Sequence, residues 1–308
     1  MMVRLLRRPQ VLLVVTFAAL ILTGTVLLRL PAAHGDRTVG VLDALFTATS
    51  ATCVTGLITV DTATAYSRFG QTVILVLIQL GGLGIMTFAA LGAELLRLRV
   101  SFTSQAALQD MFLHEQVWGG LRRVVRRIIA LTVVVEAAGA ALLYAGLPAG
   151  AGVFPAVFLS IAAFCNAGFS VYSDNVISVC QSRLVTIGLM LLVIIGGLGY
   201  PVLFEAIERA GCRLRRRRPR PVLPSLQARV VLRASVGLTV GGAVALLLTG
   251  GAALGSSFGE RCWHSLFHSV TARTAGFNAV PIGTLPVAAL LVLLLLMFVG
   301  GSPGSCAG

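Results

Sequence analysis

Six apolar segments, each about 20 residues long, set the strongest limit on how this chain can fold. They cover residues 11–30, 71–91, 128–147, 184–207, 230–253 and 285–299. A helix of about 20 apolar residues crosses the hydrocarbon core of a bilayer, where an exposed backbone must bond to itself. A hydrophobic content of 57% and a mean hydropathy of +0.94 agree with this, because soluble domains are far less apolar. The sequence therefore predicts an all-α membrane protein with six crossings.

Arginine accounts for all 24 basic residues, and its placement orients the chain. The arginines gather in alternate connections, within residues 4–8, 97–127 and 209–233, whereas the other connections carry few. Cytoplasmic loops carry the excess of positive charge in membrane proteins. We therefore expect a multi-pass protein of the bacterial plasma membrane whose N-terminus lies in the cytoplasm. The net charge of +13 then indicates contact with lipid headgroups and not with nucleic acid.

The three connections expected outside the cell share a semi-apolar segment, at residues 52–57, 164–169 and 272–277. Each copy carries an anchor glycine, namely Gly56, Gly168 or Gly276, and these follow one another at intervals of 112 and 108 residues. A second glycine-rich motif begins 24 to 28 residues after each anchor. Two motifs that recur in phase indicate a duplicated unit. We infer a helix, a re-entrant pore loop and a helix, used three times.

The repeats and the charged connections divide the chain into five parts. Repeat 1 covers residues 1–96, repeat 2 covers 128–208, and repeat 3 covers 230–308 and is truncated in its second helix. Residues 97–127 are expected to form a cytoplasmic amphipathic linker that lies on the membrane surface as a helix. Residues 209–229 are expected to form a cytoplasmic Arg/Pro-rich linker that faces lipid.

The recurring segments have the composition of cation-binding loops. Rings of backbone carbonyls can replace part of a cation's hydration shell, and glycine lets the backbone turn so that successive carbonyls point one way. Short helices predicted at residues 43–51, 155–163 and 261–271 would direct their negative C-terminal ends at the ion. Asp43 fits the N-cap of the first, and Pro155 fits the first turn of the second. The alternative is that the loops are buried turns whose glycines serve packing.

Each repeat carries longer motifs around its anchor glycine. The first repeat carries Phe-Thr-Ala-Thr-Ser-Ala-Thr-Cys-Val-Thr-Gly-Leu at 46–57 and Gln-Leu-Gly-Gly-Leu-Gly-Ile-Met-Thr at 79–87. The second carries Asn-Ala-Gly-Phe at 166–169 and Ser-Asp-Asn at 173–175. The third carries Ser-Val-Thr-Ala-Arg-Thr-Ala-Gly-Phe-Asn at 269–278 and Phe-Val-Gly-Gly-Ser-Pro-Gly at 298–304. These motifs resemble those of the Trk/Ktr family of potassium-uptake proteins, and the resemblance covers nearly the whole chain.

This resemblance implies four repeats around one central pore of the potassium-channel type, in a homodimer that sits on a cytosolic nucleotide-binding regulatory ring. It implies that filter carbonyls hold K+. The cysteines have no histidine partners at metal-site spacing, so no transition-metal site is predicted. The implied selectivity filter consists of Thr52, Cys53, Val54, Thr55, Gly56, Cys165, Asn166, Ala167, Gly168, Arg273, Thr274, Ala275 and Gly276. The implied gate is a break in the second helix of the third repeat, at Gly300, Gly301, Ser302, Pro303 and Gly304.

The sequence ends at Gly308, inside the predicted gate segment, without a fourth repeat. Three quarters of a pore wall would leave polar backbone facing hydrocarbon, which is strongly unfavourable. We therefore expect a fragment that does not conduct ions alone. The alternative is a non-conducting subunit that assembles with an intact partner.

Four charged side chains near the loops carry further expectations. Asp61 and Asp174 follow their anchor glycines by five and six residues, where carboxylates at an outer mouth would concentrate cations. The alternative is that both are turn residues in solvated loops. Glu136 lies within an apolar segment, and Arg273 lies three residues before its anchor glycine. We expect both to brace the structure, because charges at membrane depth are usually paired. For Glu136 the alternative is a role in ion passage.

The cysteines and histidines do not form a metal-binding pattern. Cys53 and Cys165 occupy the same position in their repeats and are expected to pack behind the filter. His264 and His268 are four residues apart, but no third ligand is near in sequence. We expect this pair to pack at a helix interface.

The predicted function is potassium uptake through a carbonyl-lined pore, with Na+ as an alternative ion and with no bound cofactor. An enzyme of the membrane would require convergent carboxylates, a complete metal-ligand set or a phosphate-binding loop, and the sequence contains none of these patterns. The chain is therefore not expected to be an enzyme.

Overall fold

The computed structural model describes residues 9–84, 121–214, 225–302 and 305–306. The surface helix predicted within the 97–127 linker lies outside this part, except that residues 121–127 begin a long helix. Residues 215–224 of the Arg/Pro-rich linker lie outside it too, as do Pro303 and Gly304 of the predicted gate. The regular elements of the described residues are all helical, so the predicted all-α fold is confirmed.

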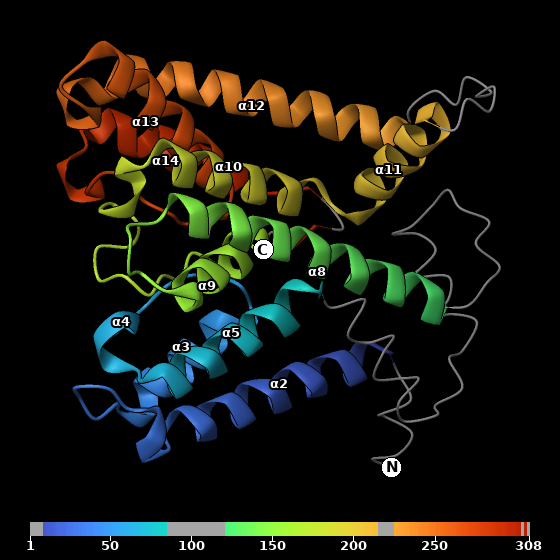
Figure 1. Ribbon diagram of the computed structural model, residues 1–308, viewed down its shortest axis with the longest axis vertical. Coiled ribbons are helices and arrows are strands. Elements are labelled where there is room, and N and C mark those ends of the chain that lie inside the picture. Colours follow the sequence, from blue (N-terminus) through green and yellow to red (C-terminus); the bar gives the residue numbers. More distant parts are fainter. Residues whose placement is uncertain (1–8, 85–120, 215–224, 303–304, 307–308) are drawn as a thin grey trace.

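Three units of helix, short helix and helix follow one another along the longest axis of the molecule (Figure 1). The first unit contains α2 (Pro9–Leu28), α3 (Val41–Thr52), α4 (Thr62–Ala65) and α5 (Arg68–Gly82). The second contains α8 (Leu121–Gly146), α9 (Val153–Phe164), α10 (Arg183–Leu198) and α11 (Tyr200–Leu214). The third contains α12 (Leu226–Gly250), α13 (Phe258–Thr271) and α14 (Val287–Val299). Single 3-10 turns lie at Pro31–Ala33, Val179–Gln181, Gly251–Leu254 and Ile282–Thr284.

The interfaces between successive units are built alike. Helix α5 of the first unit packs against α9 of the second, and α10 of the second packs against α13 of the third. At the first interface the Arg68 guanidinium lies 4.6 Å from the centre of the Phe154 ring. At the second, the Arg183 guanidinium lies 6.0 Å from the Trp263 ring. Both arginines are the first residue of their helix, so the same cation–π contact recurs with each step from one unit to the next.

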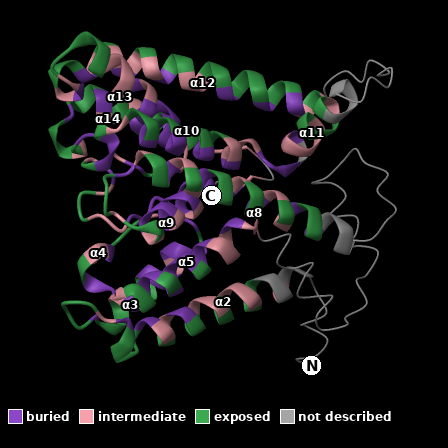
Figure 2. Cartoon of the chain, viewed as in Figure 1, coloured by how far each residue is buried: buried purple, intermediate pink, exposed green. Residues whose placement is uncertain are grey.

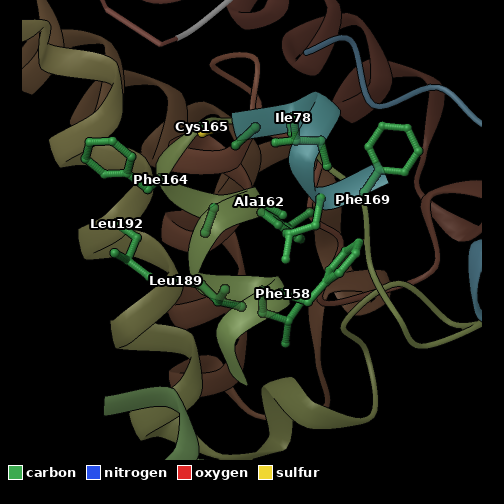
Figure 3. Packing of buried hydrophobic residues seen from close by; sticks show 14 of the residues in the cluster. Ile78, Phe158, Ala162, Phe164, Cys165, Phe169, Leu189 and Leu192 are labelled. Carbon is green, nitrogen blue, oxygen red and sulfur yellow. The ribbon is translucent and has the colours of Figure 1, made fainter. Parts of the chain in front are cut away.

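Helix α9 occupies the centre of the described core. Eight of its 12 residues are buried, and its composition is apolar on every side. A helix that is hydrophobic all round needs partners all round, and α9 has them in α5, α8 and α10. Figure 3 shows Phe158, Ala162 and Phe164 packed among Ile78, Leu189 and Leu192. In Figure 2 the buried residues gather around α9, whereas α2 and α12 expose much of their surface.

The exposed surfaces of the outer helices are apolar, as lipid contact requires. Leu22, Val26, Leu248 and Phe298 are between 61% and 92% exposed. Helices 125–146 and 226–254 are long and apolar enough to cross a membrane, while 14–28, 68–82 and 287–299 are shorter apolar helices. The chain is thus a membrane protein by its helices as well as by its composition.

The crossing predicted at residues 184–207 is not one continuous helix. Helices 183–198 and 202–210 meet at an angle of 106°, and together they form one broken span or a re-entrant segment. The break falls at Gly199, which has a φ of 85°, and Pro201 follows it. A left-handed glycine ends α10, and a proline near the start of α11 has no N–H to lose. Beyond the bend, Glu205 accepts hydrogen bonds from the backbone N–H and hydroxyl of Ser225 at 2.8 and 2.7 Å, which ties α11 to the start of α12.

The short helices begin earlier than the sequence predicts. The N-cap of α3 is Gly40, not Asp43, which instead lies in the first turn. Helix α9 begins two residues before Pro155, which confirms the early-turn proline. Helix α13 begins at Phe258 because Ser257 and Glu260 form a capping box there.

Candidate functional site

The three anchor glycines lie against one another where the loops of the three units meet. A Cβ atom built on Gly56 would lie 2.6 Å from the Ala167 carbonyl oxygen and 3.2 Å from the Gly168 Cα. One built on Gly168 would lie 2.9 Å from the Ala275 carbonyl oxygen and 3.4 Å from the Gly276 Cα. Side chains could not occupy these positions without moving backbone. Residues more than 100 positions apart in sequence therefore form one site made mainly of main chain.

The first two short helices end in the same hydrogen-bonded cap. In α3 the N–H of Thr55 donates to the Ser50 carbonyl at 2.8 Å, and the N–H of Val54 donates to Ala51 at 3.2 Å. In α9 the N–H of Ala167 donates to the Ala162 carbonyl at 2.8 Å, and the N–H of Asn166 donates to the Ala163 carbonyl at 3.1 Å. These are the two bonds of a Schellman motif, which stops a helix by turning the next residue into the left-handed region.

Left-handed backbone recurs at alternate residues in each loop. Val54, Asn166 and Thr274 have φ values of 54°, 57° and 69°, although none is glycine. Each precedes its anchor glycine by two residues, and the anchors have φ values of 78°, 68° and 73°. A β-branched residue rarely adopts this conformation, which costs about 1–3 kcal/mol and is found mainly at functional sites. Because a left-handed residue reverses the side on which the next carbonyl lies, the alternation permits neighbouring carbonyls to share a direction.

The third loop departs from the other two. Its left-handed residue, Thr274, follows α13 one position later, and Ala275 and Gly276 both donate to the Thr271 carbonyl, at 2.9 and 3.1 Å. The loops also differ in burial. The second loop is buried from Cys165 to Gly168, whereas Cys53 in the first and Gly276 in the third are exposed. The second loop therefore lies between the other two.

The second glycine motif of each repeat lies directly behind its own loop. A Cβ built on Gly81 would lie 2.0 Å from the Thr52 carbonyl oxygen, and one on Gly196 would lie 1.8 Å from that of Phe164. Thr52 and Phe164 both lie four residues before their anchor glycine. In the first two units the glycine motifs therefore recur in phase because the backbones of the loop and the helix touch.

In the third unit a side chain makes the equivalent connection. The Nε of Arg273 donates to the carbonyl of Gly300 at 3.3 Å, and Gly300 ends α14 with a φ of 65°. A cation at the C-terminal end of a helix is electrostatically favourable. Arg273 is therefore bonded to the first residue of the predicted gate segment.

The gate segment also bonds to the second unit. The hydroxyl of Ser302 donates to the Gly197 carbonyl at 2.8 Å, and the Cys306 N–H donates to the Gly196 carbonyl at 3.2 Å. The chain beyond α14 thus crosses the end of α10 next to the bend at Gly199.

Both aspartates of the predicted outer mouth act as local caps. Asp61 is the N-cap of α4 and accepts from the Ala63 N–H at 3.0 Å. Asp174 accepts from the Ser178 N–H at 2.7 Å and from its hydroxyl at 3.2 Å. Each carboxylate therefore bonds within its own turn, which agrees with the alternative that both aspartates are turn residues.

Glu136 belongs to a polar connection between the first two units. Its Oε2 accepts from the Gln79 amide at 3.1 Å, and its backbone carbonyl accepts from the Ser160 hydroxyl at 2.7 Å. Gln79 in turn accepts a weak bond from the Cys165 thiol, 3.9 Å away. Glu136 Oε1 has no partner among the described residues. These contacts join α8 to α5 and to the end of α9.

The described residues contain no group of three His, Cys, Asp or Glu side chains that could hold a metal ion. His264 bonds through Nδ1 to the Leu254 carbonyl, and the buried His268 packs edge-on against Phe267. Both histidines therefore pack within the third unit.

Four residues make contacts that the sequence did not predict. Ser257 and Glu260 fit the capping-box pattern and could have been found from it. Gln79 and Asn175 stood within the family motifs, but nothing in the sequence assigned either of them a partner, because each one bonds to a different unit.

The chain matches known proteins over nearly its whole length. Residues 4–308 match the family model described as "TrkH: Cation transport protein". The chain is 36% identical over 304 residues to Ktr system potassium uptake protein B of Bacillus subtilis, an alignment that covers 97% of the chain and 66% of that protein. It is 33% identical over 309 residues to potassium/sodium uptake protein NtpJ of Enterococcus hirae, with the same coverage of 97% and 66%.

A solved structure shares the fold. The potassium transporter TrkH from Vibrio parahaemolyticus superposes with a TM-score of 0.75 at 19% sequence identity, over 98% of this chain and 58% of that one. The chain therefore spans about two thirds of the length of the curated relatives that it matches.

Proposed function

The chain belongs to the TrkH family of cation transport proteins, and on this basis we propose that it forms part of a potassium-uptake pathway across the plasma membrane. This family consists of cation transporters and not of enzymes, so the resemblance inferred from the loop motifs is confirmed. K+ is the proposed ion because relatives are named for potassium uptake, and Na+ is the second candidate because NtpJ is named for both ions.

The observation that carries the proposal is the meeting of the three anchor glycines. A Cβ built on any of them would lie 3.2–3.4 Å from the Cα of another anchor glycine, and each glycine follows a short helix whose C-terminal end carries negative dipole charge. Main-chain carbonyls at such a place can replace water around a dehydrated cation. This supports a filter made from residues 52–56, 165–168 and 273–276, with the gate in the segment that begins at Gly300.

The proposal extends to how the protein is placed and assembled. The arginine pattern supports a cytoplasmic N-terminus. Family resemblance supports a homodimer with a cytosolic nucleotide-binding ring. Purification of the full-length protein from its native membrane, followed by measurement of the mass of the complex, tests the assembly.

Growth and ion flux test the transport function directly. The full-length protein is expressed in a bacterial strain that lacks its own potassium uptake, and growth at low external K+ is scored. The purified protein is then reconstituted into liposomes and K+ influx is measured. We expect growth rescue and K+ influx, and their absence with protein present in the membrane contradicts the proposal.

Two glycine variants assign that flux to the filter. Gly168→Ala places a side chain at a φ of 68° and 2.9 Å from the Ala275 carbonyl. The strain of about 1–3 kcal/mol at this position is expected to lower K+ influx about tenfold or more. Gly241→Ala is the control, because a Cβ there would meet no atom within 4 Å. Equal influx in both variants would mean that the glycine site is not the pathway.

A further inference from the structure

The loop that leaves the second filter segment reaches across to the third. The Asn175 side-chain Nδ2 donates to the Gly276 carbonyl at 3.4 Å, and its Oδ1 accepts from the Asn278 N–H at 3.1 Å. One amide side chain thus bonds the carbonyl that precedes Phe277 and the N–H that follows it, as a neighbouring β-strand would. The Phe277 side chain is 1% exposed and packs in the core, so its packing also holds the bonded segment in place.

The sequence between the filter and Asn175 holds this side chain in place. The Ser170 hydroxyl donates to the Asn175 carbonyl and accepts from the Tyr172 N–H at 3.1 Å, which closes the loop into a compact turn. The Asn175 N–H donates to the Tyr172 carbonyl at 3.2 Å. Asn175 has a φ of 64°, in the left-handed region that asparagine tolerates better than most residues. The position therefore suits asparagine through its backbone as well as through its amide.

The third loop differs from the first two in the hydrogen bonds that hold it. Its helix ends without the pair of bonds that caps the first two short helices, and its anchor glycine is exposed. Of the anchor carbonyls in the described residues, that of Gly276 accepts a hydrogen bond from the side chain of another unit. The orientation of the peptide plane after Gly276 is therefore set by a residue of the second unit.

We propose that Asn175 is a positioning residue for ion selectivity, which holds the outer end of the third filter segment at the spacing that favours K+ over Na+. The proposal rests on the proposed function, since it assigns a role within the same filter. Carbonyl number and placement distinguish the two ions, so a filter segment that can shift outward discriminates between them less well. Asn175 acts through the backbone of Gly276 and Asn278 and need not touch the ion.

Two substitutions distinguish the role of the Asn175 side-chain hydrogen bonds from that of the left-handed backbone at this position. Asn175→Gly keeps access to the left-handed conformation and removes both bonds. Asn175→Asp also tolerates that conformation, keeps the acceptor for the Asn278 N–H and removes the donor to the Gly276 carbonyl. The full-length protein in liposomes is assayed for K+ and Na+ influx, normalised to the amount of reconstituted protein.

We expect the ratio of K+ influx to Na+ influx to fall about three- to tenfold in both variants. A change of this size corresponds to the net free energy of one or two hydrogen bonds. Ser173→Gly is the matched control. The Ser173 side chain is exposed, lies in the same turn and makes no hydrogen bond to the described residues. The influx ratio of this variant should equal that of the unaltered protein.

Each other outcome overturns the inference. A variant that transports with an unchanged ratio shows that Asn175 does not set selectivity. If neither variant reaches the membrane while Ser173→Gly does, Asn175 serves folding alone. Failure of the unaltered protein to carry K+ contradicts the proposed function instead, and this separates the two tests.

Discussion

Gly196 illustrates how a single absent side chain shapes this protein. Its α10 backbone passes so close to the end of α9 that a built Cβ would lie 1.8 Å from the Phe164 carbonyl oxygen. Gly81 has the same relation to Thr52 in the first unit, at 2.0 Å. Backbone atoms cannot move aside as a flexible side chain can, so any larger residue must push the helix away from the loop.

We expect Gly196→Ala to destabilise the protein and to reduce transport. Overpacking of this kind costs about 1–3 kcal/mol and sometimes more. Gly197→Ala is a close control, because its Cβ would lie 3.7 Å from the nearest atom, the Asn166 Nδ2, which is an ordinary contact. Thermal unfolding of the detergent-solubilised protein measures both. Equal melting temperatures for the two variants would refute this account of the glycine motif.

At the scale of the element, the ends of the short helices decide where the loops lie. Helices α3 and α9 end in Schellman caps, and α13 begins with a capping box. In this box the Glu260 N–H donates to the Ser257 hydroxyl at 3.2 Å, and the Glu260 Oε2 accepts from the Ser257 N–H at 3.3 Å. The Ser256 hydroxyl, with the backbone N–H groups of Ser257 and Ser256, lowers the pKa of Glu260 below its usual 4.5. The carboxylate form is therefore the one that stabilises the start of α13.

The sign of the pH dependence follows from this depressed pKa. The unfolded chain binds a proton at Glu260 more readily than the folded protein, so the contribution is complete above pH 4.5 and is lost as pH falls through the lower folded value. We expect Glu260→Gln to lower the melting temperature at neutral pH and to match the unaltered protein in strong acid. A melting-temperature difference that grows as the pH falls would contradict the capping role.

At the scale of the whole molecule, side-chain contacts repeat with the units. Arg68 and Arg183 place the same cation–π contact at successive interfaces, and Glu136 with Gln79 adds a polar bond between the first two units. Each of these contacts joins residues that are remote in sequence. Together they set the spacing of the units, and the spacing of the units sets how the anchor glycines meet.

Two Glu136 variants test whether this residue braces the units or serves ion passage. Glu136→Gln keeps an acceptor for the Gln79 amide, so we expect K+ influx to stay within about twofold of the unaltered protein. Glu136→Ala leaves the Gln79 amide without this partner, and we expect it to lower the free energy of unfolding by about 1–3 kcal/mol. Loss of influx in Glu136→Gln with unchanged stability would assign Glu136 to ion passage instead.

The amino-acid sequence alone determined the membrane class, the three repeated units and the loops with their anchor glycines. The length of an apolar segment and the period of a motif can both be read along the chain without knowledge of the fold. The sequence did not determine the bend at Gly199 or the N-cap of α3 at Gly40. Nor could it pair Asn175 with Gly276, Arg273 with Gly300 or Gly196 with Phe164. Those contacts join backbone and side chains of different elements, and only the tertiary structure, in which distant residues become neighbours, decided them.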